Sequence, residues 1–384
     1  MSAPLEGIRV IELARILAGP WIGQTLADLG ADVIKVESPD GDDTRRWGPP
    51  YVDDGETSSA AYFHACNRGK RGIVLDFTTP EGQAAVKALI LTADVVVENF
   101  KVGGLAKYGL DYASLAEHQP GLIYCSITGF GQTGPQAHRA GYDFMVQGIA
   151  GIMDLTGEPQ GSPQKIGVAF ADIFSGLYGV VGIQSALLQR ARTGRGQQID
   201  ISLLDCMGGV LANQAMNYLA TGVVPRRMGN AHPNIAPYQT VAVSDGHIII
   251  ACGNDAQFAR LAISLDLADL ALDERFATNA ARVRHRLLLT ETIEAKTRLW
   301  AKDALLARLE TIVVPAGPIN TMSELFNDPQ FVSRGMQIEV EGVPGVRTPL
   351  TFSEAELVLA RRSPRLGEHT QEILRDIGCD FDQL

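Results

Sequence analysis

The sequence predicts an α/β protein in which helices cover both faces of a parallel sheet. Over the first two hundred residues, short apolar runs rich in β-branched side chains alternate with longer stretches of helical periodicity. Runs that are apolar throughout are typical of strands buried on both faces. The chain has 384 residues, 46% of them hydrophobic and 20% charged, so it is globular and too long for one core. We therefore expect two domains, with the binding site at the carboxyl ends of the strands.

The elements of the first domain follow in order along the chain. A helical stretch runs from Ala18 to Leu29. Another helix starts after Thr79, because threonine suits an N-cap and Pro80 suits the first helical position. Residues 38–60 form a polar loop beside the first strands. Strands are expected at 8–13, 33–37, 72–77, 94–98, 122–127 and 199–203.

The second half of the chain predicts a smaller α+β unit. After a helix from about Leu204 to Ala220, the segment 221–239 breaks every periodicity and indicates a linker. A strand at 247–252 and helices at 255–265 and 288–310 follow, and an amphipathic helix at 366–380 returns to the first domain. The expected parts are a large domain, a linker, a small domain and a C-terminal return, at 1–204, 205–230, 231–325 and 326–384.

Charge and cysteine content narrow the possible partners. The formal net charge of -11 repels nucleic acid and anionic membranes, so we expect neither as a partner. Five scattered cysteines without a C-x-x-C pair, and dispersed histidines, predict no disulfide framework and no metal site. The N-terminus lacks a signal-peptide pattern, and no run of about 18 apolar residues occurs. We expect a cytoplasmic enzyme.

One nucleotide-binding pattern is present in the sequence but lacks the helix that it needs to bind a dinucleotide. Residues 129–134 match G-x-G-x-x-G after a predicted strand. Pro135 and the polar residues after it do not open a helix, and the dinucleotide mechanism needs a helix N-terminus for the pyrophosphate. A simple turn is the favoured interpretation.

Asp172 is the main candidate for chemistry. It lies in the apolar stretch VAFADIFSGLYGVV, residues 168–181. An aspartate with so little hydration has a destabilised charge unless it is paired. The alternative is that Asp172 caps the helix that runs to Arg190, since aspartate is a favoured cap. Both can hold, because a residue at a helix start can also present its carboxylate to a cleft.

Basic residues gather near the predicted strand ends. Lys70 and Arg71 precede one strand, and Lys101 and Lys107 follow another. Such charges usually form a solvated face. In an acidic protein, however, basic residues at the carboxyl edge of a parallel sheet suit a phosphorylated ligand.

Motifs along most of the chain resemble the family III coenzyme A transferases, which include formyl-CoA, carnitine-CoA and dicarboxylate-CoA transferases. The matching stretches are LxGIRVIEL at 5–13, AGP at 18–20, LGADVIKVE at 29–37, NRxKR at 67–71, DVVVENF at 94–100, SITGFGxxGP at 126–135, GYD at 141–143, ADIFSG at 171–176, TGRGQ at 193–197 and LGEHT at 366–370. The resemblance implies a Rossmann-like, CoA-binding large domain, a small domain and an interlocked homodimer.

The resemblance also implies the chemistry. Asp172 stands where the family has its catalytic aspartate, which forms an acyl-aspartyl anhydride and then an aspartyl-CoA thioester. The substrates are then a CoA ester as donor and a carboxylic acid as acceptor, with no permanently bound cofactor and no metal.

Further site residues follow by motif. The family contacts coenzyme A or lines the thioester cleft at Lys70, Arg71, Asn99, Phe100, Lys107 and Tyr142. Phe100 also fits a core position, and Tyr142 a structural hydrogen bond.

The substrate assignment rests on departures from the formyl-CoA transferases. Leu17 replaces the glutamine that approaches the acceptor in those enzymes, and their tetraglycine loop is missing. Both departures weaken an oxalate or formate assignment. Arg15, Arg46 and His232 are expected to bind the distal carboxylate of a short dicarboxylic acid such as succinate.

Two other functions compete with the transferase. A 2-methylacyl-CoA racemase of the same structural family needs a histidine in the motif that here reads G-Y-D, and Tyr142 is a poor base because tyrosine has a pKa of about 10. A non-catalytic CoA-binding protein is the second alternative.

Overall fold

The computed structural model describes residues 2–378 and divides into two compact units. Unit 1 comprises residues 2–150, Ile166–Leu211 and 329–378, and unit 2 comprises Gly151–Lys165 and Ala212–Asp328. Cys379 and the end of the predicted C-terminal helix lie outside the described residues.

Unit 1 is built on a six-stranded parallel sheet, as the sequence predicts. In spatial order the strands are β5 (Arg71–Val74), β2 (Asp32–Glu37), β1 (Arg9–Glu12), β6 (Val95–Glu98), β7 (Ile123–Thr128) and β8 (Gln198–Ser202). The chain order runs outward from β1 in one direction and then from β6 in the other. The switch between β1 and β6 is where open α/β sheets bind ligands, outside the carboxyl ends of the strands.

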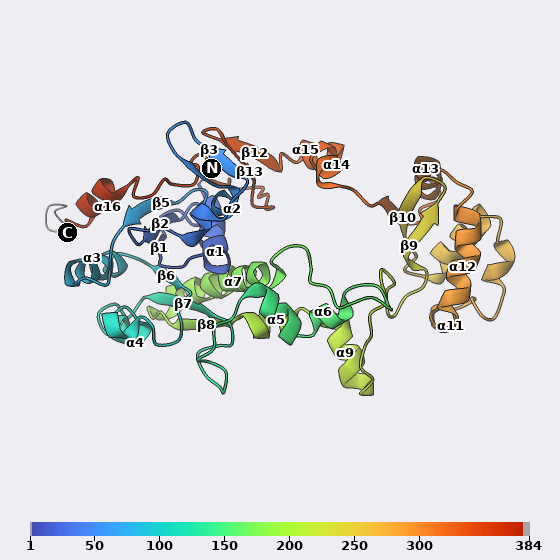
Figure 1. Ribbon diagram of the computed structural model, residues 1–384, viewed down its shortest axis with the longest axis horizontal. Coiled ribbons are helices and arrows are strands. Elements are labelled where there is room, and N and C mark those ends of the chain that lie inside the picture. Colours follow the sequence, from blue (N-terminus) through green and yellow to red (C-terminus); the bar gives the residue numbers. More distant parts are fainter. Residues whose placement is uncertain (1, 379–384) are drawn as a thin grey trace. The chain divides into compact units, whose positions relative to one another are not determined.

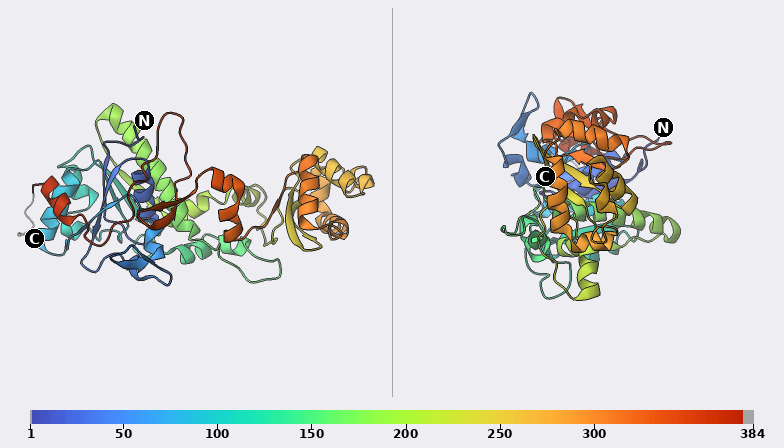
Figure 2. Two further views of the ribbon diagram at one scale, coloured as in Figure 1. Left: turned by 90° about the horizontal axis from the view of Figure 1, so that it is seen from above. Right: turned by 90° about the vertical axis from the view of Figure 1, so that its right-hand side faces the viewer.

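Helices cover both faces of this sheet (Figure 1), and Figure 2 gives two further views. The helices of unit 1 are α1 (Ala18–Asp28), α2 (Ala61–His64), α3 (Pro80–Leu91), α4 (Tyr112–Ala116), α5 (Asp143–Ile149), α7 (Phe170–Thr193), α8 (Leu203–Gly209), α15 (Pro329–Ser333) and α16 (Thr370–Asp376). Two 3-10 turns, η1 (Asp43–Arg46) and η2 (Ala106–Tyr108), and two hairpins, β3–β4 (Tyr51–Asp53, Ser58–Ala60) and β12–β13 (Gln337–Val340, Val343–Val346), complete it.

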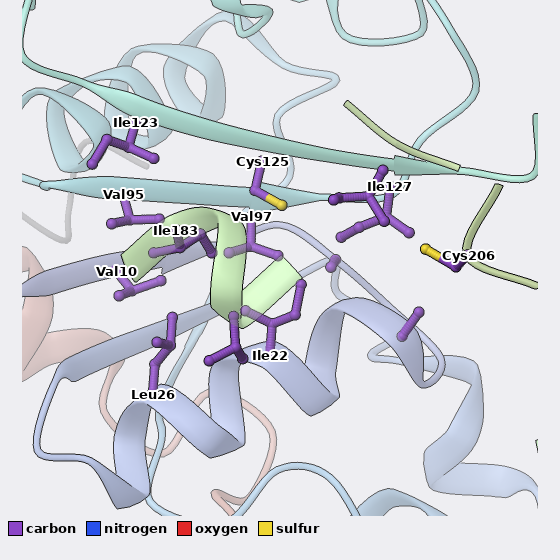
Figure 3. Packing of buried hydrophobic residues seen from close by; sticks show 14 of the residues in the cluster. Val10, Ile22, Leu26, Val95, Val97, Ile123, Cys125, Ile127, Ile183 and Cys206 are labelled. Atoms are coloured by element: carbon purple, nitrogen blue, oxygen red, sulfur yellow. The ribbon is translucent and has the colours of Figure 1, made fainter. Parts of the chain in front are cut away.

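Alternate side chains of each strand point to opposite faces and build two cores. Val10, Val95 and Cys125 pack against α1 and α7 (Figure 3), whereas Ile11 and Val96 pack against α3 and α16. Both sets are buried, which explains why the strands are apolar throughout.

The helix α7 is the one helix among residues 2–378 that is long and apolar enough to span a membrane by length and composition. Its glycines instead allow close packing on α1. A Cβ atom at Gly179 would lie 2.3 Å from Cδ1 of Ile22, and one at Gly176 would lie 3.0 Å from Cδ1 of Trp21. The helix therefore belongs to the core of unit 1.

Unit 2 has its own core around a three-stranded antiparallel sheet. The strand order is β11 (Ala316–Pro318), β10 (Gly246–Ala251) and β9 (Tyr238–Val243). Its helices are α6 (Ile152–Leu155), α9 (Ala212–Thr221), α10 (Asp255–Ser264), α11 (Asn279–Arg284), α12 (Arg286–Thr297), α13 (Lys302–Thr311) and α14 (Met322–Asn327), with a 3-10 turn η3 (Ala268–Ala271).

Two helices that the sequence predicts as continuous are each divided into two in the structure. The helix expected from Leu204 to Ala220 is broken into α8 and α9, where the Gly208–Gly209 pair ends the first and Ala212 has a φ of 46°. The helix expected at 288–310 is two helices, because the chain turns after Thr297 so that the carbonyl of Trp300 accepts the Ser244 amide.

Candidate active site

Asp172 is the third residue of α7 and is partly buried. Among the described residues, no group hydrogen-bonds its carboxylate. Burial, and then the nearby charge of Asp143, raises the pKa of Asp172 to about 7. The carboxylate is thus a weakly solvated anion near the N-terminus of a long helix, whose dipole favours negative charge.

Asp172 does not cap its helix. The N-cap residue of α7 is Ala169, which makes no side-chain capping bond. The amide of Ala171 instead donates to Oδ1 of Asp143 at 2.8 Å, and Nε2 of Gln147 donates to Oδ2 at 2.8 Å. The capping interpretation is therefore wrong: Asp143 takes over the capping bond, and the Asp172 carboxylate is left free.

Tyr62 is a neighbour of Asp172 that the sequence analysis missed. Burial, and then the charge of Asp172, raises the pKa of Tyr62 to about 12. Its ring packs edge-on against the half-exposed ring of Trp47, with centroids 5.4 Å apart. Tyr62 therefore stays protonated at neutral pH, and its phenol can donate a hydrogen bond within electrostatic reach of the Asp172 carboxylate. No motif marks it, because its proximity to Asp172 arises only through the fold.

Arg15 and Arg46 meet on one carboxylate. Nη1 of Arg15 lies 3.2 Å from Oδ2 of Asp43, and Nη2 of Arg46 lies 3.2 Å from Oδ1. All three side chains are well exposed, so these ion pairs are readily exchanged. Leu17, two residues after Arg15, is buried and forms the N-cap position of α1.

Lys70 is fully buried. Its Nζ donates to Oε1 of Glu12 at 2.9 Å, to the carbonyl of Pro20 at 2.9 Å and to Oδ1 of Asn67 at 2.8 Å. Burial lowers the pKa of Lys70 against the opposing charge of Glu12. All three N–H groups are in use, which argues against direct contact with a ligand.

Arg71 holds the C-terminal helix. Its guanidinium pairs with Asp32 at 2.7 Å, Glu372 at 2.9 Å and Asp376 at 3.0 Å. These carboxylates raise its pKa against the effect of burial. The arginine therefore fastens α16 to the edge of the sheet.

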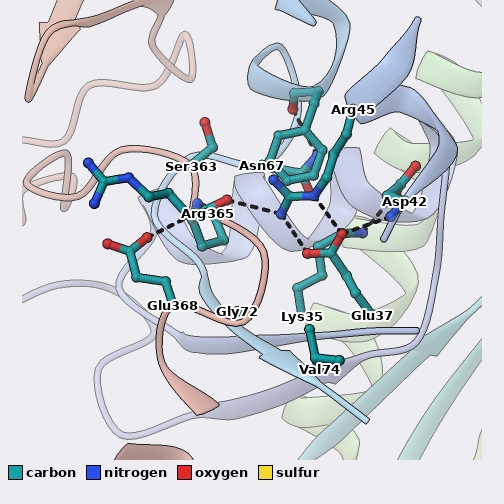
Figure 4. A network of polar contacts seen from close by, with 12 residues as sticks. Lys35, Glu37, Asp42, Arg45, Asn67, Gly72, Val74, Ser363, Arg365 and Glu368 are labelled. Carbon is teal, nitrogen blue, oxygen red and sulfur yellow. Dashed lines mark hydrogen bonds and ion pairs between the residues drawn. The ribbon is translucent and has the colours of Figure 1, made fainter. Parts of the chain in front are cut away.

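The same buried charge network continues from Glu12 to the ends of β1 and β2 (Figure 4). Lys35 contacts Asp42 at 3.0 Å and Glu12 at 3.1 Å. Arg45 donates to both oxygens of Glu37, at 2.8 and 2.6 Å. These pairs hold the loop between β2 and η1 in place.

The other predicted ligand positions lie in loops or in the short turn η2. Both polar atoms of the Asn99 amide bond the backbone of Arg15, and the ring of Phe100 packs edge-on against Phe77 at 5.8 Å. Lys107 is exposed, with Nζ 4.5 Å from the centroid of Tyr108. Tyr142 precedes α5 and is 66% exposed.

His232 belongs to unit 2. Its ring packs against Tyr238 with centroids 5.1 Å apart, and burial lowers its pKa. Within residues 2–378, no group of three or more histidine, cysteine or acidic side chains is arranged to hold a metal ion.

Comparison with known proteins decides the family. A sequence model of the family described as CoA-transferase family III matches residues 5–370. The chain belongs to this family. It is a CoA-transferase, which acts on coenzyme A thioesters and carboxylic acids.

Named relatives of this family III transferase match it over nearly its whole length. The succinate–glutarate CoA-transferase of Agrobacterium fabrum is 58% identical over 382 residues, covering 97% of this chain and 96% of that protein. The human succinyl-CoA:glutarate CoA-transferase is 40% identical, covering 97% and 86%. Among solved structures, a CAIB/BAIF family protein from Brucella suis is 66% identical with a TM-score of 0.89, covering 98% of this chain and 100% of that one.

Proposed function

We propose that this enzyme transfers coenzyme A between short dicarboxylic acids, with succinyl-CoA as donor and a succinate- or glutarate-like acid as acceptor. The observation that carries the proposal is the Asp172 carboxylate, with its pKa raised to about 7 in the first turn of α7. The names of the relatives, succinate–glutarate and succinyl-CoA:glutarate CoA-transferase, support the substrate class.

The proposed reaction has four covalent steps. An oxygen of Asp172 attacks the thioester carbonyl of the donor, giving a mixed anhydride and releasing the CoA thiolate. The thiolate attacks the aspartyl carbonyl, which forms an aspartyl-CoA thioester and releases the donor acid. The acceptor carboxylate then attacks this thioester, giving a second anhydride and the thiolate again. Finally, the thiolate attacks the acceptor acyl carbonyl and regenerates the Asp172 carboxylate.

The surroundings of Asp172 favour each of these steps. Burial destabilises the ionised carboxylate, and acylation replaces it with a neutral group, so attack relieves the cost of burial. We propose that the phenol of Tyr62 donates a hydrogen bond to the oxyanion that forms at each attack. Asp143 keeps the first turn of α7 in place through its bond to Ala171.

Arg15 and Arg46 are the proposed site for the second carboxylate of the acid. Leu17 is buried, so we expect it to act on the acid only indirectly. Asp43 shows that both guanidinium groups can reach one carboxylate. A dicarboxylate that exchanges with Asp43 would gain two charge-assisted bonds, which a monocarboxylate cannot make.

For coenzyme A, we propose contacts with Phe100, Lys107 and Tyr142, at the carboxyl end of β6 and before α5. Lys107 and Tyr142 are exposed and therefore available to a ligand. The contacts of Lys70, Arg71 and Asn99 give them protein partners, so we expect these residues to act on coenzyme A only indirectly.

We further propose a cytoplasmic homodimer, in which a Rossmann-like large domain and a small domain interlock with those of a second copy. The exposed face of α7 supports a partner, because Leu177, Tyr178, Val181 and Leu188 leave an apolar stripe at helical spacing. A stripe of this kind on a charged protein is suited to burial against another chain.

Trapping the intermediate tests the mechanism. The enzyme incubated with succinyl-CoA and then hydroxylamine should carry a hydroxamate on the peptide that holds Asp172, read by mass spectrometry. A hydroxamate on another peptide would refute the nucleophile.

The substrate and the competing functions need separate assays. Carboxylic acids tested one by one against succinyl-CoA, with the CoA products read by mass spectrometry, should show dicarboxylates preferred over monocarboxylates. Incorporation of α-deuterium into 2-methylacyl-CoA in deuterated water, without any acceptor acid, would favour the racemase. Tight binding of acyl-CoA with no exchange into any acid would favour a binding protein.

A further inference from the structure

The segment between β1 and α1 is held almost entirely by side chains. The amide of Arg15 donates to Oδ1 of Asn99 at 2.9 Å, and Nδ2 of Asn99 donates to the carbonyl of Arg15 at 2.7 Å. Nζ of Lys35 donates to the carbonyl of Ala14 at 2.9 Å. The amide of Ile16 points at both oxygens of Asp42, at 3.2 and 3.4 Å.

Ile16 is in a backbone conformation that isoleucine rarely adopts. Its φ is 74°, in the left-handed region where a β-branched side chain is a genuine outlier. Such a residue persists only where its surroundings enforce it, and outliers of this kind cluster at functional sites. Here the enforcing groups are Asn99 on one side and Asp42 on the other.

Asp42, which holds the strained residue Ile16, is itself fixed by several contacts. It is fully buried, lies 3.0 Å from Nζ of Lys35, and accepts from the amide and the hydroxyl of Thr44 at 3.0 and 2.8 Å. One carboxylate thus holds both Ile16 and Thr44. These two residues are the direct neighbours of Arg15 and Asp43.

The two loops therefore have a fixed relation to each other. Arg15 comes from the β1–α1 segment, and Arg46 comes from the 3-10 turn that contains Asp43. In this arrangement their guanidinium groups converge on Asp43. We infer that a relaxed backbone at Ile16 would move Arg15 away from Asp43.

We propose that Asn99 and Asp42 are positioning residues, which hold residues 14–16 in a strained backbone so that Arg15 joins Arg46 in a subsite for the second carboxylate of the acid. This inference rests on the proposed function and assigns Asn99 a different role from a coenzyme A ligand. Asp43 occupies the subsite in the free enzyme.

A double-mutant cycle between Asn99→Ala and Arg15→Ala tests the proposal. Asn99→Ala should raise the KM for glutarate about tenfold with kcat within about twofold, and should leave the KM for butyrate unchanged. In the Arg15→Ala background, Asn99→Ala should have no further effect, because the side chain that it positions is gone. Asp42→Asn should raise the KM for glutarate in the same way as Asn99→Ala. If Asp42→Asn does not fold, the double-mutant cycle between Asn99 and Arg15 tests the proposal without it.

The matched control is Asn254→Ala, which removes an asparagine that accepts the Gln257 amide at 2.9 Å in unit 2. It should change neither KM. Any change in the affinity for coenzyme A is measured separately, by calorimetric titration of free coenzyme A into wild type and Asn99→Ala.

Three results would overturn the proposal: additive effects of Asn99→Ala and Arg15→Ala, equal effects on glutarate and butyrate, or weaker binding of free coenzyme A with an unchanged glutarate KM. Failure of the proposed function is distinguishable. If wild type transfers coenzyme A to no dicarboxylate, the proposed function is wrong. The subsite is then tested by itself, by calorimetric titration of glutarate and, separately, of butyrate into wild type and Asn99→Ala. The subsite is supported if wild type binds glutarate more tightly than butyrate and Asn99→Ala loses this preference. It is refuted if wild type binds the two acids equally.

Discussion

Replacing Asp172 by asparagine should abolish activity and at the same time stabilise the fold. Asparagine keeps the shape of the side chain but cannot form the anhydride, so we expect CoA transfer to fall by at least about a thousandfold. The variant also removes a charge that burial disfavours. The same substitution therefore moves activity and stability in opposite directions.

The size of the stability change follows from the pKa of Asp172. Burial raises this pKa from its ordinary value of 3.8 to about 7. The folded chain therefore binds the proton more tightly than the unfolded chain, and stability falls as the pH rises from about 4 to about 7. At roughly 1.4 kcal/mol per pKa unit, the charge costs the fold about 4 kcal/mol above pH 7.

Two measurements check these expectations. Urea unfolding at pH 8 should give Asp172→Asn a free energy of unfolding about 4 kcal/mol higher than wild type, with the difference vanishing below pH 4. In wild type, kcat/KM should fall about tenfold for each pH unit below 7, because only the ionised carboxylate attacks.

A less stable Asp172→Asn at pH 8 would refute the assignment of a destabilised charge. Retained transferase activity in that variant would refute the nucleophile, and a pH profile that is flat from 5 to 8 would refute the raised pKa. Glu339→Gln, at an exposed carboxylate in β12, is the matched control and should change neither property.

Three further predictions concern packing and partners. Lys70→Met should lower the free energy of unfolding by about 1–3 kcal/mol, measured in urea, because it leaves Glu12 with Lys35 as its remaining partner and leaves Asn67 Oδ1 without its donor; a selective rise in the KM for CoA esters with unchanged stability would contradict this. Gly179→Ala should cost about 1–3 kcal/mol, because its Cβ would lie 2.3 Å from an atom of a core isoleucine, whereas Gly208→Ala meets nothing within 4 Å and should not destabilise. Leu188→Glu should shift the protein to monomers in light scattering, whereas Leu272→Glu, at a still more exposed position of unit 2, should not. An unchanged mass of Leu188→Glu would exclude α7 from the interface.

The sequence by itself determined the layering of the large unit. Runs such as Val95–Val97 are apolar at every position, which only a sheet with two covered faces explains. The Thr79 N-cap also follows from local chemistry, and its side chain accepts the Gly82 amide as predicted. The apolar setting of Asp172 likewise predicts its raised pKa, because its neighbours in sequence are its neighbours on the helix.

Only the tertiary structure decided where the charged side chains go. Lys70 reads as a surface residue next to Arg71, but its partner Glu12 lies 58 positions away, on the first strand. In the same way, Arg15 and Arg46 meet on Asp43, and Tyr62 comes within the field of Asp172. An apolar strand is stabilised by contact with any apolar surface, whereas an ion pair needs two particular residues within about 4 Å of each other. The packing of the helices and strands sets that distance.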